Sequence, residues 1–148
     1  MFDKYFDELN IGERWESRGR TITETDLVLF SAFTGDWYPL HTDKEWAARI
    51  PFKQRIAHGM LVLSVATGLF NMVPGPIAAF YGMERVRFVR PTFIGDTLYV
   101  AVEVTGKEEK DAQRGLVAFR IEVKSKTHET KAVFDMKILM NKILYEGV

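Results

Sequence analysis

The sequence predicts an α+β fold in which a five-stranded, mostly antiparallel sheet wraps around one central, buried helix. Three observations predict this fold. A run at 59–72 is apolar on almost every side, which is typical of a helix that other elements bury. Four runs of alternating apolar residues fill the C-terminal half of the chain and indicate strands. The turns between them are short, and short turns join antiparallel neighbours.

Length and composition restrict the class of protein. The 148 residues fit one continuous domain over 1–148, without internal repeats or linkers. The formal net charge is zero, with 20 basic and 20 acidic residues, so the cationic excess of a general nucleic-acid-binding protein is absent. The absence of cysteine excludes disulfides and thiol nucleophiles. With only three histidines, we expect no metal site.

The sequence also indicates where the protein acts. No apolar run reaches the roughly 18 residues that a membrane span requires. The first residues lack the basic and then apolar pattern of a signal peptide. We therefore expect a cytoplasmic protein without a membrane partner.

The N-terminal half contains a strand over 15–22 and then a helix. Thr23 can cap the free amides of that helix, and Glu24 and Asp26 occupy the first turn, where the helix dipole favours acidic residues. The helix is expected to end at Gly35. A short helix follows over 44–48.

The central helix is expected over 59–72, where Pro74, Gly75 and Pro76 stop it. The strands that follow are expected at 80–89, 98–104, 117–123 and 132–138, with turns at 95–96, 107–111 and 127–129. One helix covers only one face of this sheet. A homodimer or higher homo-oligomer that extends or backs the sheet is therefore expected.

The densest polar cluster lies at 34–43. Asp36 and His41 would point about 140° apart on a helix and to opposite faces of a strand. Gly35 and Pro39 instead indicate a loop, which can bring both side chains to one point. A carboxylate and an imidazole that converge on one water form an acid–base pair. The simpler alternative is that Asp36 caps a turn and His41 only packs.

A second cluster opens the central helix. Gly59 places free backbone N–H groups and the positive end of the helix dipole where a ligand can approach closely, as an oxyanion hole requires. Alternatively, His58 and Gly59 only form a tight entry into the helix. Ser64 and Gly68 share one helix face, which either lines an active site or allows close packing.

Together these segments resemble the MaoC-like (R)-specific enoyl-CoA hydratase and dehydratase family of the hot-dog fold. The matching motifs are Gly35-Asp36-x-x-Pro39-x-His41, Ile56-Ala57-His58-Gly59-Met60-Leu61-x-x-Ser64, Phe88-x-x-Pro91-x-x-x-Gly95-Asp96-x-Leu98 and the opening Phe6-Asp7-Glu8-Leu9-x-Ile11-Gly12. One position departs from the family pattern, because Tyr38 occupies the place of an Asn.

The resemblance implies reversible addition of water to a trans-2-enoyl-CoA, giving the (R)-3-hydroxyacyl-CoA, without a metal or redox cofactor. Asp36 and His41 would hold the catalytic water and exchange protons, with their acid and base roles left open. The Gly59 amide would bind the thioester carbonyl, and Ser64 would support the site. Tyr38, beside the pair, would influence either the acyl-chain preference or the direction in which the loop points.

The acyl-CoA substrate carries phosphates, so basic residues should line its path. His58 and the strand residues Arg85, Arg87 and Arg90 are the candidate substrate-binding residues. A second basic group consists of Arg49, Lys53 and Arg55. For any single one of these arginines and lysines, a solvated surface charge is the simpler interpretation.

Other functions of the same fold remain as alternatives. A hot-dog thioesterase commonly places a carboxylate on the central helix, and the segment 59–72 has none. A dehydratase acting on acyl-carrier protein would differ in how the pantetheine arm is presented. A non-catalytic acyl-CoA-binding or regulatory module would leave Asp36 and His41 idle, and a purely structural protein would leave their loop unexplained.

Overall fold

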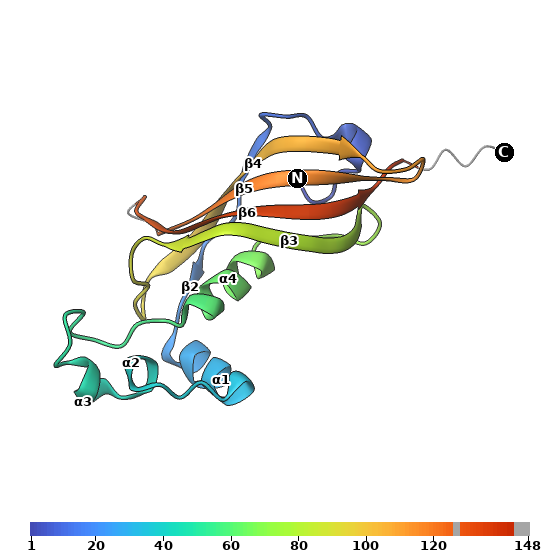
Figure 1. Ribbon diagram of the computed structural model, residues 1–148. Coiled ribbons are helices and arrows are strands. Elements are labelled where there is room, and N and C mark those ends of the chain that lie inside the picture. Colours follow the sequence, from blue (N-terminus) through green and yellow to red (C-terminus); the bar gives the residue numbers. More distant parts are fainter. Residues whose placement is uncertain (126–127, 144–148) are drawn as a thin grey trace.

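In the computed structural model, which describes residues 1–125 and 128–143, a curved antiparallel sheet bends around one helix (Figure 1). The strands are β1 (Arg14–Glu16), β2 (Arg20–Thr21), β3 (Ile77–Phe88), β4 (Thr97–Glu109), β5 (Arg114–Ser125) and β6 (Thr130–Asn141). The helices are the 3-10 turn η1 (Phe6–Glu8), α1 (Glu24–Thr34), α2 (Pro39–Thr42), α3 (Lys44–Ala47) and α4 (Gly59–Gly68).

The sheet has the strand order β1-β4-β5-β6-β3, with β2 also beside β4. The four predicted C-terminal strands are confirmed. The strand predicted over 15–22 is instead two short pieces, both paired with β4. The interruption lies at Ser17, whose hydroxyl accepts the N–H of Val100 at 2.9 Å in place of a strand carbonyl.

The core lies between the sheet and α4. Alternate residues of β4, β5 and β6 face the helix and are fully buried, because successive strand residues point to opposite faces. The opposite face carries ion pairs such as Arg120–Asp135 and Arg14–Glu103. This outer face is therefore polar and needs no cover.

Helix α1 begins and ends as its sequence predicts. Thr23 and Asp26 form a capping box, in which each side chain accepts the other residue's backbone N–H. Gly35 closes the helix with φ of 79°, a left-handed conformation that glycine adopts without strain.

Helix α4 is shorter than predicted, because it ends at Gly68 rather than at residue 72. Leu69 and Phe70 leave the helix to enter the core, and the ring of Phe70 lies 4.7 Å from that of Phe2. The burial of α4 is also incomplete in the single chain. Met60, Ser64 and Gly68, spaced one turn apart, are exposed along one side.

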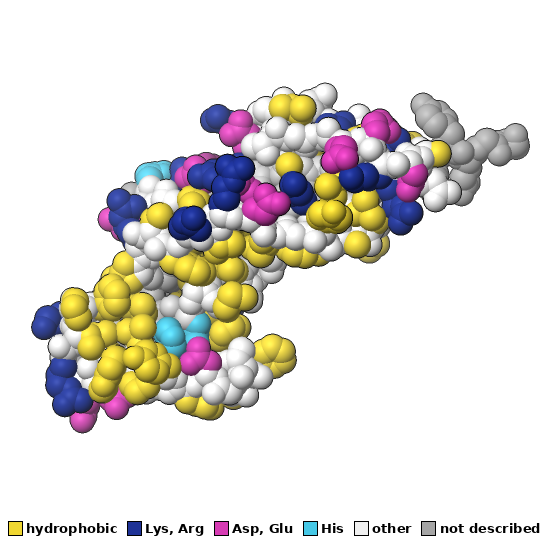
Figure 2. Space-filling model, in the orientation of Figure 1, with side chains coloured by type: hydrophobic (Ala, Val, Ile, Leu, Met, Phe, Trp, Pro, Cys, Tyr) yellow, Lys and Arg dark blue, Asp and Glu magenta, His cyan; other side chains and the backbone are white. Residues whose placement is uncertain are grey.

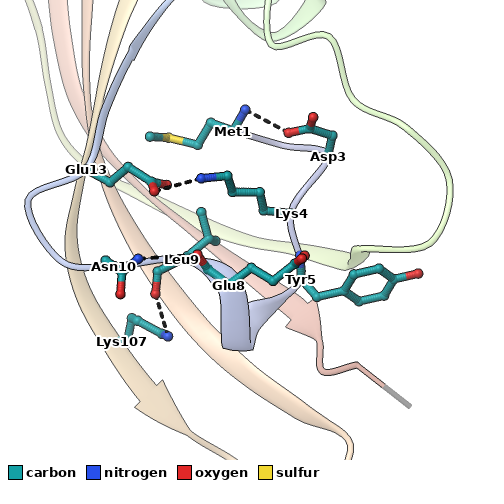
Figure 3. A network of polar contacts seen from close by, with 9 residues as sticks. All are labelled: Met1, Asp3, Lys4, Tyr5, Glu8, Leu9, Asn10, Glu13 and Lys107. Atoms are coloured by element: carbon teal, nitrogen blue, oxygen red, sulfur yellow. Dashed lines mark hydrogen bonds and ion pairs between the residues drawn. The ribbon is translucent and has the colours of Figure 1, made fainter. Parts of the chain in front are cut away.

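The N-terminal segment packs onto the sheet through buried Phe2 and Phe6. Lys4 pairs with Glu13 at 2.8 Å, and the ammonium of Lys107 donates to the carbonyl of Leu9 at 2.7 Å (Figure 3). Helices α1, α2 and α3 gather instead near the first turn of α4 (Figure 1). No helix within the described residues is long and apolar enough to cross a membrane. The predicted turn at 127–129 lies partly outside those residues.

Candidate active site

The loop after α1 brings the predicted acid–base pair together. Gly35 turns the chain out of α1, and Pro39 then opens the one-turn helix α2, which carries His41. One nitrogen or carboxylate oxygen from each of Asp36, His41 and His58 lies within 4.8 Å of the others. The convergence of Asp36 and His41 thus follows from a loop, since neither a helix nor a strand would produce it.

The tautomer of His41 follows from its hydrogen bond. Its Nδ1 lies 2.7 Å from the carbonyl oxygen of Ile56, and a carbonyl only accepts, so Nδ1 carries the proton. In the neutral ring Nε2 then has a free lone pair. His41 is therefore oriented as a proton acceptor.

Asp36 is oriented by its own loop. Its carboxylate accepts the backbone N–H of Tyr38 at 3.2 Å, and its backbone N–H donates to the hydroxyl of Thr34 at 3.1 Å. The side chain is exposed. A carboxylate held in this way can accept a further hydrogen bond from water.

His58 lies beneath the pair and is only 2% exposed. Its Nε2 is 3.1 Å from the hydroxyl of Ser31 and 3.2 Å from the backbone oxygen of Asp36. Its ring stacks on that of His41, with 3.8 Å between the centroids. Burial is the main cause that lowers the pKa of His58 below its ordinary value of 6.5, against the opposing effect of the Asp36 carbonyl.

An apolar cavity of about 590 Å³ opens beside His41, a volume in the usual range for small-molecule pockets. In Figure 2, histidine and acidic side chains meet in a hollow with hydrophobic side chains on either side. The cavity is lined by Leu40, His41, Phe52, Ile56, Ala57, Gly59, Met60, Val62, Phe88, Val89, Arg90, Pro91 and Thr92.

Gly59 lies on the cavity wall at the first position of α4. A Cβ at this position would lie 2.7 Å from Cζ of Phe88, so the ring of Phe88 leaves room only for glycine. The first amides of a helix have no intrahelical acceptor. They are therefore available to a carbonyl oxygen in the cavity.

Of the basic residues proposed for the substrate, Arg90 lines the cavity. Arg85 instead faces Asp135 at 3.5 Å, and Arg87 donates to the carbonyl of Val86. A second hollow, of about 450 Å³, is bordered by Lys44, Lys53, Arg55 and four other residues.

Two further predicted site residues lie outside the cavity lining. Ser64 donates to the carbonyl of Met60 at 2.7 Å on the exposed side of α4. Tyr38 is exposed and lies edge-on between the rings of His41 and Trp46, at 6.3 Å and 5.8 Å. The roles assigned to both residues stay predictions.

The sequence reasoning missed Ser31, which is fully buried beside His58. A hydroxyl on the apolar face of α1 was the available signal, because a buried polar group requires a partner. The trio of Asp36, His41 and His58 also has the composition of a metal site. However, the two rings are stacked, with 3.8 Å between their centroids and an inclination of only 24°. A metal ion lies close to the plane of each imidazole that binds it, and no point within bonding distance of both rings lies close to both planes.

Comparison with known proteins identifies the family. Residues 8–127 match the family model described as the MaoC like domain. The chain belongs to the MaoC-like family. A 103-residue match to the (R)-specific enoyl-CoA hydratase of Rhodospirillum rubrum is 38% identical and covers 69% of this chain and 70% of that protein. Protein MaoC of Klebsiella aerogenes is 40% identical over 110 residues, which are 74% of this chain but 33% of that protein.

Solved structures of MaoC-like and related proteins share the architecture. A monoamine oxidase regulatory protein from Archaeoglobus is 40% identical with a TM-score of 0.89, and the match covers 96% of this chain and 97% of that one. An R-hydratase from Pseudomonas aeruginosa is 33% identical with a TM-score of 0.79, covering 93% and 86%. A Mycobacterium tuberculosis protein with a double hot-dog fold, 23% identical, covers 99% of this chain and 47% of that one with a TM-score of 0.85. The MaoC-like chain has the hot-dog fold.

Proposed function

We propose that this MaoC-like chain is a hydro-lyase that adds water reversibly to a trans-2-enoyl-CoA and gives the (R)-3-hydroxyacyl-CoA. The observation that carries the proposal is the meeting of Asp36 and His41 beside an apolar cavity that ends at the first amides of α4. Relatives named hydratase and dehydratase support the same reaction type.

The water is held by two acceptors. The lone pair of His41 Nε2 and the carboxylate of Asp36 each accept one of its hydrogens, and the water oxygen then turns a lone pair towards C3 of the enoyl group. Attack forms the C3–O bond and moves the electrons of the double bond onto the thioester oxygen. The Gly59 amide stabilises that negative oxygen with the dipole of α4.

The source of the proton that C2 receives follows from the protonation of the two side chains. The Nδ1 proton of His41 is committed to the Ile56 carbonyl, and Asp36 enters as a carboxylate, so neither group begins with a proton for C2. The proton that C2 receives is therefore the one taken from water. Hydroxide adds at C3 and the proton at C2, which returns the site to its starting state without a metal or redox cofactor. Activity should accordingly persist after dialysis against a chelator.

The substrate is proposed to enter along the cavity with its phosphates near Arg90. A thioesterase is disfavoured because α4, from Gly59 to Gly68, contains no Asp or Glu to direct water at the thioester carbon. One plant relative is named a 3-hydroxyacyl-[acyl-carrier-protein] dehydratase. Carrier-bound substrate is therefore compared with the CoA thioester in the assay below.

We also propose a homodimer that extends the sheet through β3. This 12-residue strand forms one edge of the sheet and is mostly exposed. Its side chains Phe80 and Phe88 pair with the core residues Ile138 and Ala132 and therefore point to the concave face, where they stay about half exposed. A second copy would cover them together with the exposed side of α4.

The test mixes pure protein with a short trans-2-enoyl thioester, carried either by CoA or by acyl-carrier protein, and reads the products by mass. A product heavier by one water, with CoA attached and R configuration at C3, supports the hydratase. Free CoA and an acid would establish a thioesterase instead. Turnover only of the acyl-carrier-protein thioester would restrict the substrate. Binding without turnover would point to a non-catalytic module.

A further inference from the structure

Resting on the proposed hydratase function, we propose that His58 is a positioning residue that holds both members of the catalytic pair. Its ring face supports His41, and its Nε2 holds the backbone carbonyl of Asp36. The sequence placed His58 among substrate-binding residues, but its side chain is 2% exposed and does not line the cavity.

The stacking contact fixes the plane of His41. That ring is tied at its edge by one hydrogen bond, from Nδ1 to Ile56. A single bond leaves the ring free to tilt about it. The parallel face of His58, with 3.8 Å between the centroids, removes that freedom, while Phe30 packs beside His58 with 4.9 Å between the centroids. Nε2 of His41 is thereby directed at a constant angle.

The polar contact fixes the loop. The carbonyl of Asp36 only accepts, so Nε2 of His58 carries the proton and donates to it. This bond orients the peptide between Asp36 and Trp37. The next peptide supplies the N–H of Tyr38, which binds the Asp36 carboxylate. The hydroxyl of Ser31 lies 3.1 Å from the same Nε2 and thereby connects α1 to His58.

His58 also occupies the N-cap position of α4, directly before Gly59. One residue therefore connects the loop of Asp36, the ring of His41 and the amide proposed for the thioester oxygen. The titratable groups that act on it are His41 and Asp36. Burial keeps its ring neutral by lowering its pKa, so a proton taken up by His41 meets an uncharged neighbour.

The experiment separates the two contacts. His58→Phe keeps an aromatic face and loses the donor, His58→Gln keeps an N–H donor and loses the ring, and His58→Leu keeps neither. The matched control is His128→Gln, because the side chain of His128 is exposed and bonds Tyr99 at 3.0 Å, away from the cavity. Each protein is measured for kcat, KM and thermal midpoint.

We expect kcat to fall about tenfold or more in His58→Phe and His58→Gln, and further in His58→Leu, with KM within about threefold, because small misplacements of reacting groups are costly. The control should match the unmodified protein. A raised KM with unchanged kcat would assign His58 to substrate contact and overturn the proposal. A lower thermal midpoint with unchanged kcat would reduce it to a structural residue, which also overturns it.

A second readout does not depend on turnover. With only three histidines in the chain, nitrogen-15 spectra can follow the tautomer of each ring against pH. His41 should be a pure Nδ1–H tautomer in the unmodified protein and a mixture of tautomers in His58→Leu. An unchanged His41 in all three variants would refute positioning. If the tautomer of His41 changes in His58→Leu but the unmodified protein hydrates no enoyl-CoA, the positioning role of His58 stands. That result would refute only the proposed hydratase reaction.

Discussion

Asp36 and His41 are five residues apart, and the short loop between them brings their side chains together. His41 is held at its Nδ1 by Ile56, whereas Asp36 is held by the loop amides. The two side chains are therefore held by separate hydrogen bonds, while His58 contacts both segments. Either side chain can be changed without removing the support of the other.

This independence leads to the first prediction. Asp36→Asn and His41→Ala should each lower kcat by a factor of about 10² to 10⁴, the usual contribution of a general acid or base. Because Asp36 is exposed and His41 is only partly buried, the circular-dichroism spectrum and thermal midpoint should change little. The measurement is the initial rate of enoyl-CoA hydration. Full activity in either variant rules out the mechanism.

The burial of His58 should make the stability of the protein depend on pH. Burial lowers its folded pKa, so between the ordinary value of 6.5 and that lower value the unfolded chain binds more protons. The free energy of unfolding should be at its full value above pH 6.5 and should fall as the pH drops through this window.

Urea titrations above and below that value measure the effect. The comparison is His58→Leu, which has no imidazole to bind the proton. Its free energy of unfolding should therefore change less with pH in this window. Exposed carboxylates are the same in both proteins, so their contribution cancels in the comparison. An equal slope in the two proteins would mean that His58 is not held neutral by the fold.

At the scale of elements, the start of α4 depends on a close contact with β3. Gly59 leaves room for the ring of Phe88, which a Cβ would approach to 2.7 Å. The same contact forms the cavity wall beside the helix amides. Helix and strand therefore define the site jointly, although neither carries the acid–base pair.

Gly59→Ala should destabilise the protein by about 1–3 kcal/mol, the usual cost of overpacking. Phe88→Ala should relieve most of that cost, because it removes the ring that the new methyl group meets. Chemical denaturation of the two single variants and the double variant gives the coupling energy. Additive effects in the double variant would show that the contact is not the reason for the glycine.

For the whole molecule, the distribution of exposed apolar side chains indicates how the proposed second copy would attach. The outer face of the sheet carries ion pairs, whereas the concave side of β3 and one side of α4 expose Phe80, Phe88 and Met60. The sequence left open whether a dimer extends or backs the sheet. These exposures favour extension at β3.

Phe80→Glu should convert a dimer to a monomer, because a buried unpaired charge at the interface is costly. Ile11→Glu is the matched control, since Ile11 is 66% exposed, compared with 56% for Phe80, and lies outside β3. Sedimentation velocity measures the assembly state. If both variants sediment like the unmodified protein, the dimer does not use this edge.

Local patterns predicted much of the architecture. Alternating apolar runs located the four long strands, and the Thr23 cap and Gly35 located both ends of α1. The end of α4 was missed because Leu69 and Phe70 are as apolar as the helix before them. These two residues leave the helix because they pack into the core, and the local sequence does not show that contact. The break in the first strand was missed because it depends on a hydroxyl bond from Ser17 to a distant strand.

For the site, the sequence by itself determined the chemical groups. Asp36, His41 and the glycine that opens α4 are recognisable because their spacing within short segments restricts what the backbone can do. Only the tertiary structure decided how these groups are held. The stacking of His58 on His41, its bond to the Asp36 carbonyl and the burial of Ser31 join α1, α2 and α4. Such contacts depend on distances between segments far apart in the chain, and a local pattern contains no information about those distances.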